Sequence, residues 1–131
     1  MITISQELLD EIAVQAKREA PNEACGYIAG LDGVAHERYP MTNIDASPQH
    51  FSFAPEEQFS ALKRARAAGL ELIAVYHSHP ETPARMSDED LRLANDPETL
   101  YLIYSIPEQR IRGFKLGARK QVQECEVLVE A

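Results

Sequence analysis

The chain has 131 residues, 44% hydrophobic and 26% charged, which predicts one ordinary globular domain spanning residues 1–131. Its formal net charge of −8 argues against nucleic acid as a main partner, because phosphate contacts need a surplus of Lys and Arg. No apolar run is long enough to predict a membrane span.

Residues 5–18 are predicted to form the first helix, directly after Met1–Ile4. Apolar residues recur there at helical spacing, namely Leu8, Leu9, Ile12, Ala13 and Ala16. Ser5 is a suitable N-cap, and Pro21 ends the helix. Residues 25–30 and 34–39 then read as the two strands of a β-hairpin around a turn at Asp32 and Gly33.

Residues 41–54 contain Pro48 and no clear period, so we expect a loop. Residues 55–68 predict a second helix, with Gly69 at the position that follows its C-cap. The side chains expected to face the core are Phe59, Leu62 and Ala65. Residues 70–79 are nearly all apolar before their histidines, which predicts a central strand buried on both faces.

Residues 87–94 predict a third, short helix. Residues 100–106, 110–116 and 121–129 read as three strands linked by tight turns, so the chain is expected to end in a meander. Helices and strands are interspersed along the chain. This pattern predicts an α/β fold, with a mixed sheet flanked by helices.

His77 and His79 stand two positions apart at the end of the predicted central strand. Side chains alternate along a strand, so both imidazoles lie on one face and can reach one metal ion. Asp90, eleven positions after His79, can add a carboxylate. Three such ligands leave a position on zinc open for water, which is typical of a catalytic rather than a structural site. We therefore expect one zinc ion per chain.

This spacing is similar to a known family signature. His-x-His, seven residues, Ser, two residues and Asp resembles the motif of the JAMM (MPN+) metalloproteases. Glu23, in the stretch Pro21–Gly30, resembles the family's upstream Glu-x-Cys-Gly-x-x-x-Gly segment. Residues 51–116 also look like the stand-alone bacterial members. The resemblance implies an MPN-type (cytidine-deaminase-like) fold.

The resemblance also implies roles for individual residues. Zinc would be held by His77, His79 and Asp90. Glu23 would act as general base and then general acid, and Ser87 would steady the oxyanion. The expected reaction is hydrolysis of the amide bond after the C-terminal Gly-Gly of a ubiquitin-like sulfur-carrier protein, releasing an amino acid such as cysteine. We expect a sheet-edge groove beside His79 to accept the carrier's tail by backbone pairing.

Several alternatives stay open. Ser87 and Asp90 also fit a helix capping box, which is worth about 1 kcal/mol. Cys25 could be a nucleophile, although a small buried thiol is the better interpretation of its apolar surroundings. His36 and His50 have no acidic or cysteine neighbours at ligand spacing and are expected on the surface or in loops.

Other functions are also possible. One alternative is a deubiquitinase-like isopeptidase, which the modest length of the predicted loops disfavours. Another is a non-catalytic MPN scaffold, against which the intact five-residue set argues. A nucleotide-deaminase-like enzyme is disfavoured because its Pro-Cys-x-x-Cys ligand pair is absent. Only two cysteines occur and no secretory signal is visible, so we expect a reduced, cytoplasmic protein.

Overall fold

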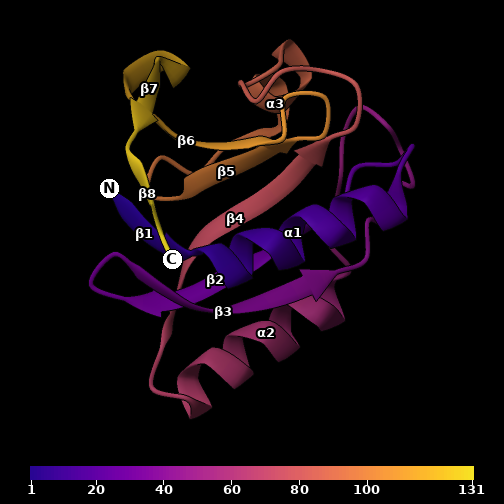
Figure 1. The fold of residues 1–131 in the computed structure, drawn as a ribbon. Coiled ribbons are helices and arrows are strands. Elements are labelled where there is room, and N and C mark those ends of the chain that lie inside the picture. The colour runs from indigo at the N-terminus through magenta and orange to yellow at the C-terminus, as the bar shows by residue number, and fades with distance from the viewer.

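The computed structural model describes residues 1–131, and its centre is an eight-stranded mixed sheet (Figure 1). The strands are β1 (Ile2–Ser5), β2 (Cys25–Leu31), β3 (Val34–Met41), β4 (Glu71–His79), β5 (Leu100–Ser105), β6 (Arg110–Leu116), β7 (Val122–Cys125) and β8 (Val127–Glu130). The helices are α1 (Gln6–Glu19), α2 (Pro55–Ala67) and α3 (Asp88–Leu93), with a short 3-10 turn, η1, over Ala118–Lys120. This arrangement confirms the predicted α/β sheet flanked by helices.

The strand order is β7-β6-β5-β4-β2-β3-β1-β8, which places β4 in the interior of the sheet. β4 pairs with β5 in parallel and with β2 in antiparallel fashion, so both of its backbone edges are hydrogen-bonded. The two outermost strands, β7 and β8, are consecutive in the chain and separated only by Glu126. The sheet therefore curls until its two ends approach one another, as the left side of Figure 1 shows.

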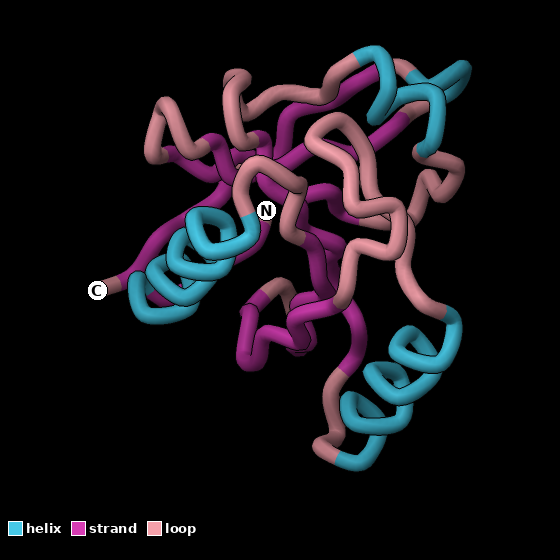
Figure 2. Tube along the Cα trace, turned by 90° about the vertical axis from the view of Figure 1, so that its right-hand side faces the viewer, coloured by secondary structure: helices cyan, strands magenta, loops and turns pink.

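Helices cover both faces of this sheet. Figure 2 shows α1 on one side of the strands, and α2 and α3 on the other. Under α1 lies the larger core, which includes Ile4, Ile12, Ile28, Tyr76 and Leu102. Under α2 lies a smaller one formed by Cys25, Ala29, Tyr39, Met41, Ala61 and Ala65. Alternation along β4 thus directs Tyr76 toward α1 and its neighbour His77 toward the face that carries α2 and α3.

The local signals for the first half of the chain are confirmed. Ser5 caps α1 by accepting a hydrogen bond from the Leu8 amide. The β2–β3 hairpin turns at Asp32 and Gly33, both with positive φ, as a tight two-residue turn requires. Gly69 has φ 72° just beyond the C-cap of α2, a conformation that favours glycine.

Both ends of the chain differ from the prediction. Residues 2–5 form β1 rather than a lead into the helix, pairing in parallel with β3 and β8. The predicted strand 121–129 is two strands, since β8 leaves β7 at Glu126 and crosses to β1. Each of these strands is only four residues long, and each depends on a partner distant in sequence. Such short strands leave little pattern in the local sequence from which their pairing could be predicted.

The predicted burial was wrong at two places. Phe59 is 60% exposed, with the Lys63 ammonium over its ring, and α2 packs on the sheet through the small residues Ala61 and Ala65. The helix face that carries these alanines lies against the sheet, so the bulky Phe59 lies outside the contact. β4 is buried on both faces only in its second half, because Glu71 is exposed and Leu72 and Ile73 are half-buried.

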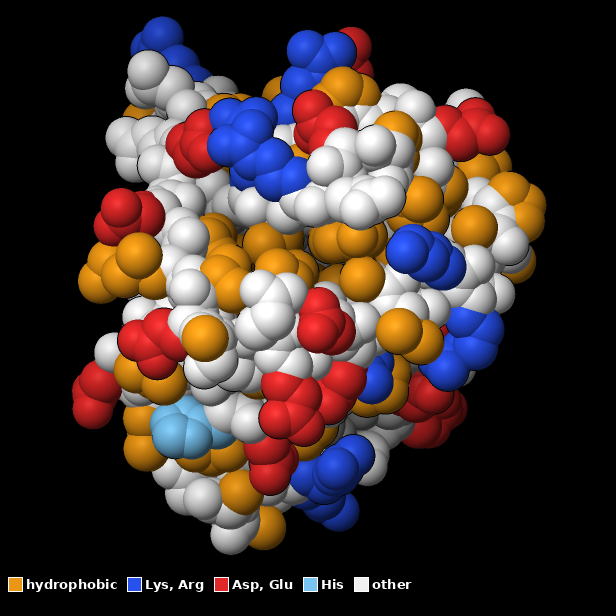
Figure 3. Space-filling view, in the orientation of Figure 1, with side chains coloured by type: hydrophobic (Ala, Val, Ile, Leu, Met, Phe, Trp, Pro, Cys, Tyr) orange, Lys and Arg blue, Asp and Glu red, His pale blue; other side chains and the backbone are white.

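The surface over α1 mixes both signs of charge, with acidic and basic side chains interspersed (Figure 3). The first turn of α1 carries Glu7, and its last turn carries Lys17 and Arg18. These positions suit the helix dipole. None of the helices combines the length and apolar character that crossing a bilayer would require.

Candidate metal centre

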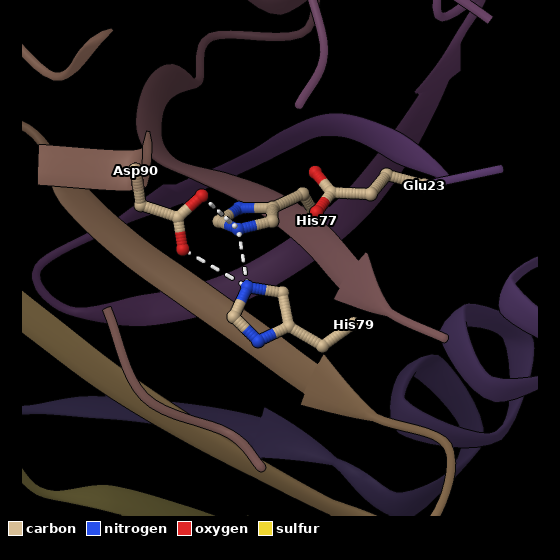
Figure 4. A group of neighbouring side chains, drawn as sticks. All are labelled: Glu23, His77, His79 and Asp90. Atoms are coloured by element: carbon tan, nitrogen blue, oxygen red, sulfur yellow. Dashed lines mark hydrogen bonds and ion pairs between the residues drawn. The ribbon is translucent and has the colours of Figure 1, made fainter. Parts of the chain in front are cut away.

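The end of β4 brings the two predicted histidines to one face of the sheet. His77 pairs with Cys25 on β2 and with Ile103 on β5, so its backbone is held from both sides. Both imidazoles are 2% exposed. Their Nε2 atoms lie 3.2 Å apart, and Glu23 and Asp90 approach the pair from opposite sides (Figure 4). The two residues are thus rigidly placed side by side.

Asp90 belongs to the first turn of α3, and the predicted capping box is present. The Ser87 hydroxyl accepts from the Asp90 amide at 3.0 Å, and Asp90 Oδ2 accepts from the Ser87 amide at 3.0 Å. The same carboxylate lies 3.2 Å from His77 Nε2 and 2.9 Å from His79 Nε2. The cap therefore aims this carboxylate at the histidines, so the capping and ligand roles are compatible.

The charge of Asp90 is stabilised by these neighbours. Burial by itself raises the pKa of Asp90, but the imidazoles of His77 and His79 and the Ser87 amide outweigh it. Together they hold the pKa of Asp90 well below its usual range. Asp90 is therefore a carboxylate, the form that binds metal ions, at neutral pH.

Glu23 lies just before β2, in a segment fastened to β4. The Ala24 amide donates to Ser78 Oγ at 2.8 Å, and the Ser78 amide donates to the Ala24 carbonyl at 2.9 Å. Asn43 Nδ2 donates to the Glu23 carbonyl at 3.0 Å. Ser78, the residue between the two histidines, thus holds Glu23 beside them although it is 54 positions from Ala24.

Glu23 is 2% exposed, and its Oε1 atom has no hydrogen-bond partner. Burial raises the pKa of Glu23 to about 9, and the nearby charge of Asp90 adds to the shift. A buried polar atom left without a partner is costly, so its presence calls for a functional explanation. The Glu23 carboxyl therefore lies where it can exchange a proton with a molecule bound between it and the side chains of His77, His79 and Asp90.

The four side chains fit a metal ion. One ligand atom from each of Glu23, His77, His79 and Asp90 lies within 4.8 Å of the others. Ligand atoms on a tetrahedral zinc with bonds of ~2.0–2.1 Å would lie about 3.3 Å apart. The contacts of 2.9 to 3.2 Å among the two imidazoles and Asp90 are close to that spacing. Nitrogen and oxygen donors of this kind suit zinc.

The His79 imidazole is also oriented by a contact at its other ring nitrogen, Nδ1. His79 Nδ1 lies 2.8 Å from the Pro83 carbonyl, an acceptor that places the proton on Nδ1 and leaves Nε2 free to bind metal. His77 has no such partner, since its buried Nδ1 is unbonded, but its ring packs on Phe51 with centroids 4.9 Å apart. Neither Phe51 nor Pro83 was predicted from the sequence, because no spacing signal distinguishes them.

Two hollows flank the candidate metal centre. The first, here called the aromatic hollow, has a volume of about 290 Å³ and walls that include Tyr27, Phe51, Phe53 and Tyr101; His77 and Asp90 also line it. The second, here called the Arg85 hollow, is an open space of about 430 Å³ that includes His79, Thr82, Arg85 and Ser87. The predicted metal ligands therefore contribute to the walls of two separate hollows.

The predicted sheet-edge groove beside His79 is wrong. β4 is an interior strand, with β5 and β2 occupying both of its edges. A substrate tail cannot pair with β4 as a new strand beside His79, because the strand's hydrogen-bonding groups already have partners. The two hollows, and not a free strand edge, define access to the site.

The other candidate residues lie outside the cluster. Cys25 is fully buried in β2, and burial together with nearby carboxylates raises its pKa to about 12, so it is not a nucleophile. His36 is exposed on β3, as expected. His50 lies in the loop as predicted, but it does have an acidic neighbour, since its Nδ1 is 2.8 Å from Asp45.

In the metal-free protein, we expect Glu23 to make stability fall as pH rises. In the folded chain the Glu23 carboxyl keeps its proton up to about pH 9, whereas after unfolding it has the ordinary pKa of 4.5. Between these values the folded state binds the extra proton, so the free energy of unfolding decreases with pH, by at most roughly 1.4 kcal/mol per unit. Urea unfolding of the metal-free wild type and of Glu23→Gln across this range measures the effect. Parallel pH profiles for the two proteins would contradict it.

Comparison with known proteins places these residues in context. A model of the family described as prokaryotic homologs of the JAB domain matches residues 5–117. The CysO-cysteine peptidase of Mycobacterium tuberculosis is 34% identical, over 99% of this chain and 92% of its own length. The desampylase of Haloferax volcanii is 33% identical, over 98% and 96% respectively.

Solved structures of other proteins are also similar to this chain. A protein from Desulfitobacterium hafniense, determined in solution, is 41% identical, with a TM-score of 0.90 over 99% of this chain and 93% of that one. A JAB1/MPN domain protein from Archaeoglobus fulgidus is 23% identical, with a TM-score of 0.68 over 99% of this chain and 100% of that one. The second match shows the fold alone, and it confirms the predicted MPN-type architecture.

Proposed function

The chain belongs to the family of prokaryotic JAB-domain proteins and is a JAMM-type metallopeptidase, and from this premise we propose that it processes a ubiquitin-like sulfur-carrier protein. The proposed reaction is hydrolysis of the amide bond after the carrier's C-terminal Gly-Gly, with release of an amino acid such as cysteine. The observation that carries the proposal is the buried Glu23, His77, His79 and Asp90 cluster. It occurs in a chain that is similar over its whole length to a CysO-cysteine peptidase.

We assign the metal as zinc, one ion per chain, held by His77, His79 and Asp90. When bound, zinc polarises the scissile carbonyl and makes water a nucleophile near neutral pH. Glu23 accepts a proton from the attacking water and passes it to the leaving amine. Its burial supports this role, because a carboxyl with a raised pKa retains the proton until the amine departs; a bound cation brings that pKa back toward neutral.

Ser87 supplies the remaining polar group in this proposal. Its oxygen accepts from the Asp90 amide, which leaves the hydroxyl proton available for the developing oxyanion. Because α3 begins at Asp88, the same hydrogen bond that caps the helix also fixes the position of the hydroxyl. One residue therefore serves both the stability of α3 and the chemistry.

Replacing Ser87 with Ala should separate these two roles. Loss of the cap should lower the free energy of unfolding by about 1 kcal/mol. Loss of an oxyanion donor should also lower kcat by about 100-fold, more than the lost stability explains. Both are measured on the zinc-loaded variant, with kcat taken at a temperature where it is fully folded. A lower Tm with unchanged kcat would show that Ser87 is only a cap.

Cleavage of carrier–protein conjugates is a second candidate function. It is favoured by the similarity to a protein of Thermus thermophilus named a probable TtuB-protein conjugate cleaving protease, which is 38% identical over 72% of this chain. Both reactions hydrolyse the amide bond that follows the C-terminal tail of a ubiquitin-like protein, and they differ in the leaving group. Ubiquitin chains are a less suitable substrate, since β5 and β6 are joined by a tight turn and offer no large insertion to grip ubiquitin.

The substrate is tested with three molecules assayed side by side by intact-mass spectrometry. They are a sulfur carrier extended by one amino acid after Gly-Gly, a carrier joined to a lysine side chain, and Lys-linked ubiquitin. We expect fastest release of the amino acid from the first. Efficient cutting of ubiquitin chains with no action on either carrier adduct would overturn the proposal.

A further inference from the structure

The segment between β4 and α3 presents a free cation beside the candidate metal centre. Arg85 lines the Arg85 hollow together with His79 and Ser87. Its guanidinium makes none of the hydrogen bonds or ion pairs found in the structure, whereas Arg38, Arg92 and Arg112 are each paired with a glutamate. An unpaired guanidinium at the edge of an active site is available to a ligand.

The backbone that carries Arg85 is held in place from several directions. The Thr82 carbonyl accepts from the Ser105 hydroxyl at 2.7 Å, and the Ala84 amide donates to the Glu108 carboxylate at 2.8 Å. Ala84 itself is fully buried against Ile103 and Phe114. The Pro83 carbonyl in the same segment bonds His79. The starting point of the Arg85 side chain is therefore fixed relative to a predicted zinc ligand.

The two hollows differ in charge. The aromatic hollow is lined by the carboxylates Asp90 and Asp96, and no Lys or Arg side chain lines it. The Arg85 hollow contains Arg85 together with one acidic residue, Asp88, with which the guanidinium forms no ion pair. In a chain of net charge −8, an anionic group entering the active site therefore finds its favourable partner on the Ser87 side.

This difference bears on the leaving group of the reaction, and the inference rests on the proposed function. An amino acid joined by its amine after Gly-Gly carries its own carboxylate one carbon away from the scissile nitrogen. We propose that the Arg85 hollow receives this leaving amino acid and that Arg85 binds its α-carboxylate. A planar guanidinium suits this task because it can donate two parallel hydrogen bonds to a carboxylate.

The arrangement makes Arg85 a specificity-determining residue. A terminal amino acid offers the carboxylate, whereas the lysine side chain of a protein conjugate has none at that position. The hollow therefore favours the release of a single C-terminal amino acid over the cutting of conjugates. Ser87, the proposed oxyanion donor, lines the same hollow.

The test uses the full-length, zinc-loaded protein and a matched pair of substrates. Both are a sulfur carrier extended after Gly-Gly by one alanine, which ends in a free carboxylate in one and in a carboxamide in the other. We expect wild type to cleave the acid with a kcat/KM about 10- to 100-fold higher than the amide, as for a charge-assisted hydrogen bond. Arg85→Gln should reduce this ratio toward 1, and Arg85→Lys should retain part of it. The control Arg66→Gln, on the exposed face of α2, should keep the full ratio.

Binding provides a readout that does not depend on turnover. With zinc-loaded Glu23→Gln, calorimetry should give an affinity for the acid adduct about 10-fold or more above that for the amide, and adding Arg85→Gln should abolish the difference. Equal cleavage of acid and amide by wild type, or an unchanged ratio in Arg85→Gln, would overturn the role of Arg85 and leave the proposed function intact. If zinc-loaded wild type cleaves neither adduct, the proposed function fails, and this inference fails with it.

Discussion

Glu23→Gln is expected to retain zinc and to lose at least ~100-fold in the rate of carrier-adduct hydrolysis. Gln has nearly the shape of Glu, so the packing beside His77 is preserved, but it cannot accept the proton of the attacking water. The Glu23 backbone is held by Asn43, and that of its neighbour Ala24 by Ser78, and the substitution leaves these bonds in place. The loss should therefore appear in kcat, with zinc content unchanged.

Elemental analysis and single-turnover kinetics on the same preparation check this result. Glu7→Gln, an exposed change in the first turn of α1, serves as the matched control and should be fully active. A Glu23→Gln protein with normal turnover would exclude Glu23 as the proton carrier. Its raised pKa would then be only a consequence of burial.

The double substitution His77→Ala and His79→Ala is expected to abolish stoichiometric zinc binding and all zinc-dependent hydrolysis. Asp90 would remain as the only ligand of the predicted set, and a single carboxylate does not hold zinc tightly. Asp90 would also lose the two imidazoles that lower its pKa, while staying buried. Its pKa should therefore rise toward and beyond the ordinary value.

Zinc titration of the metal-free variant, followed by mass spectrometry under native conditions, measures the stoichiometry. His36→Ala removes an exposed histidine on β3 and should leave one zinc per chain. If the double variant still binds one zinc per chain, the ligand assignment is wrong, whatever its activity.

Much of the site could be predicted from the sequence, because the signals that place it are local. His77 and His79 share a face since side chains alternate along a strand, and this requires only that residues 71–79 form β4. Ser87 and Asp90 are brought together by a capping box within one helical turn. Each of these relationships spans only a few residues, so its geometry follows from the local backbone alone.

The tertiary structure decided the features that depend on residues distant in sequence. Glu23 reaches the histidines because β2 pairs with β4 and because Ser78 bonds Ala24, and no local pattern indicates that contact. The acceptor for His79, the pairing of β1 with β8, and the outward position of Phe59 likewise depend on packing. The charge of each hollow was also decided at this level, since it depends on which loops meet beside β4. The sequence by itself indicated which groups are candidates for the chemistry. The pairing of distant strands and loops determined how these groups are buried, oriented and reached, because long-range contacts outweigh local preference.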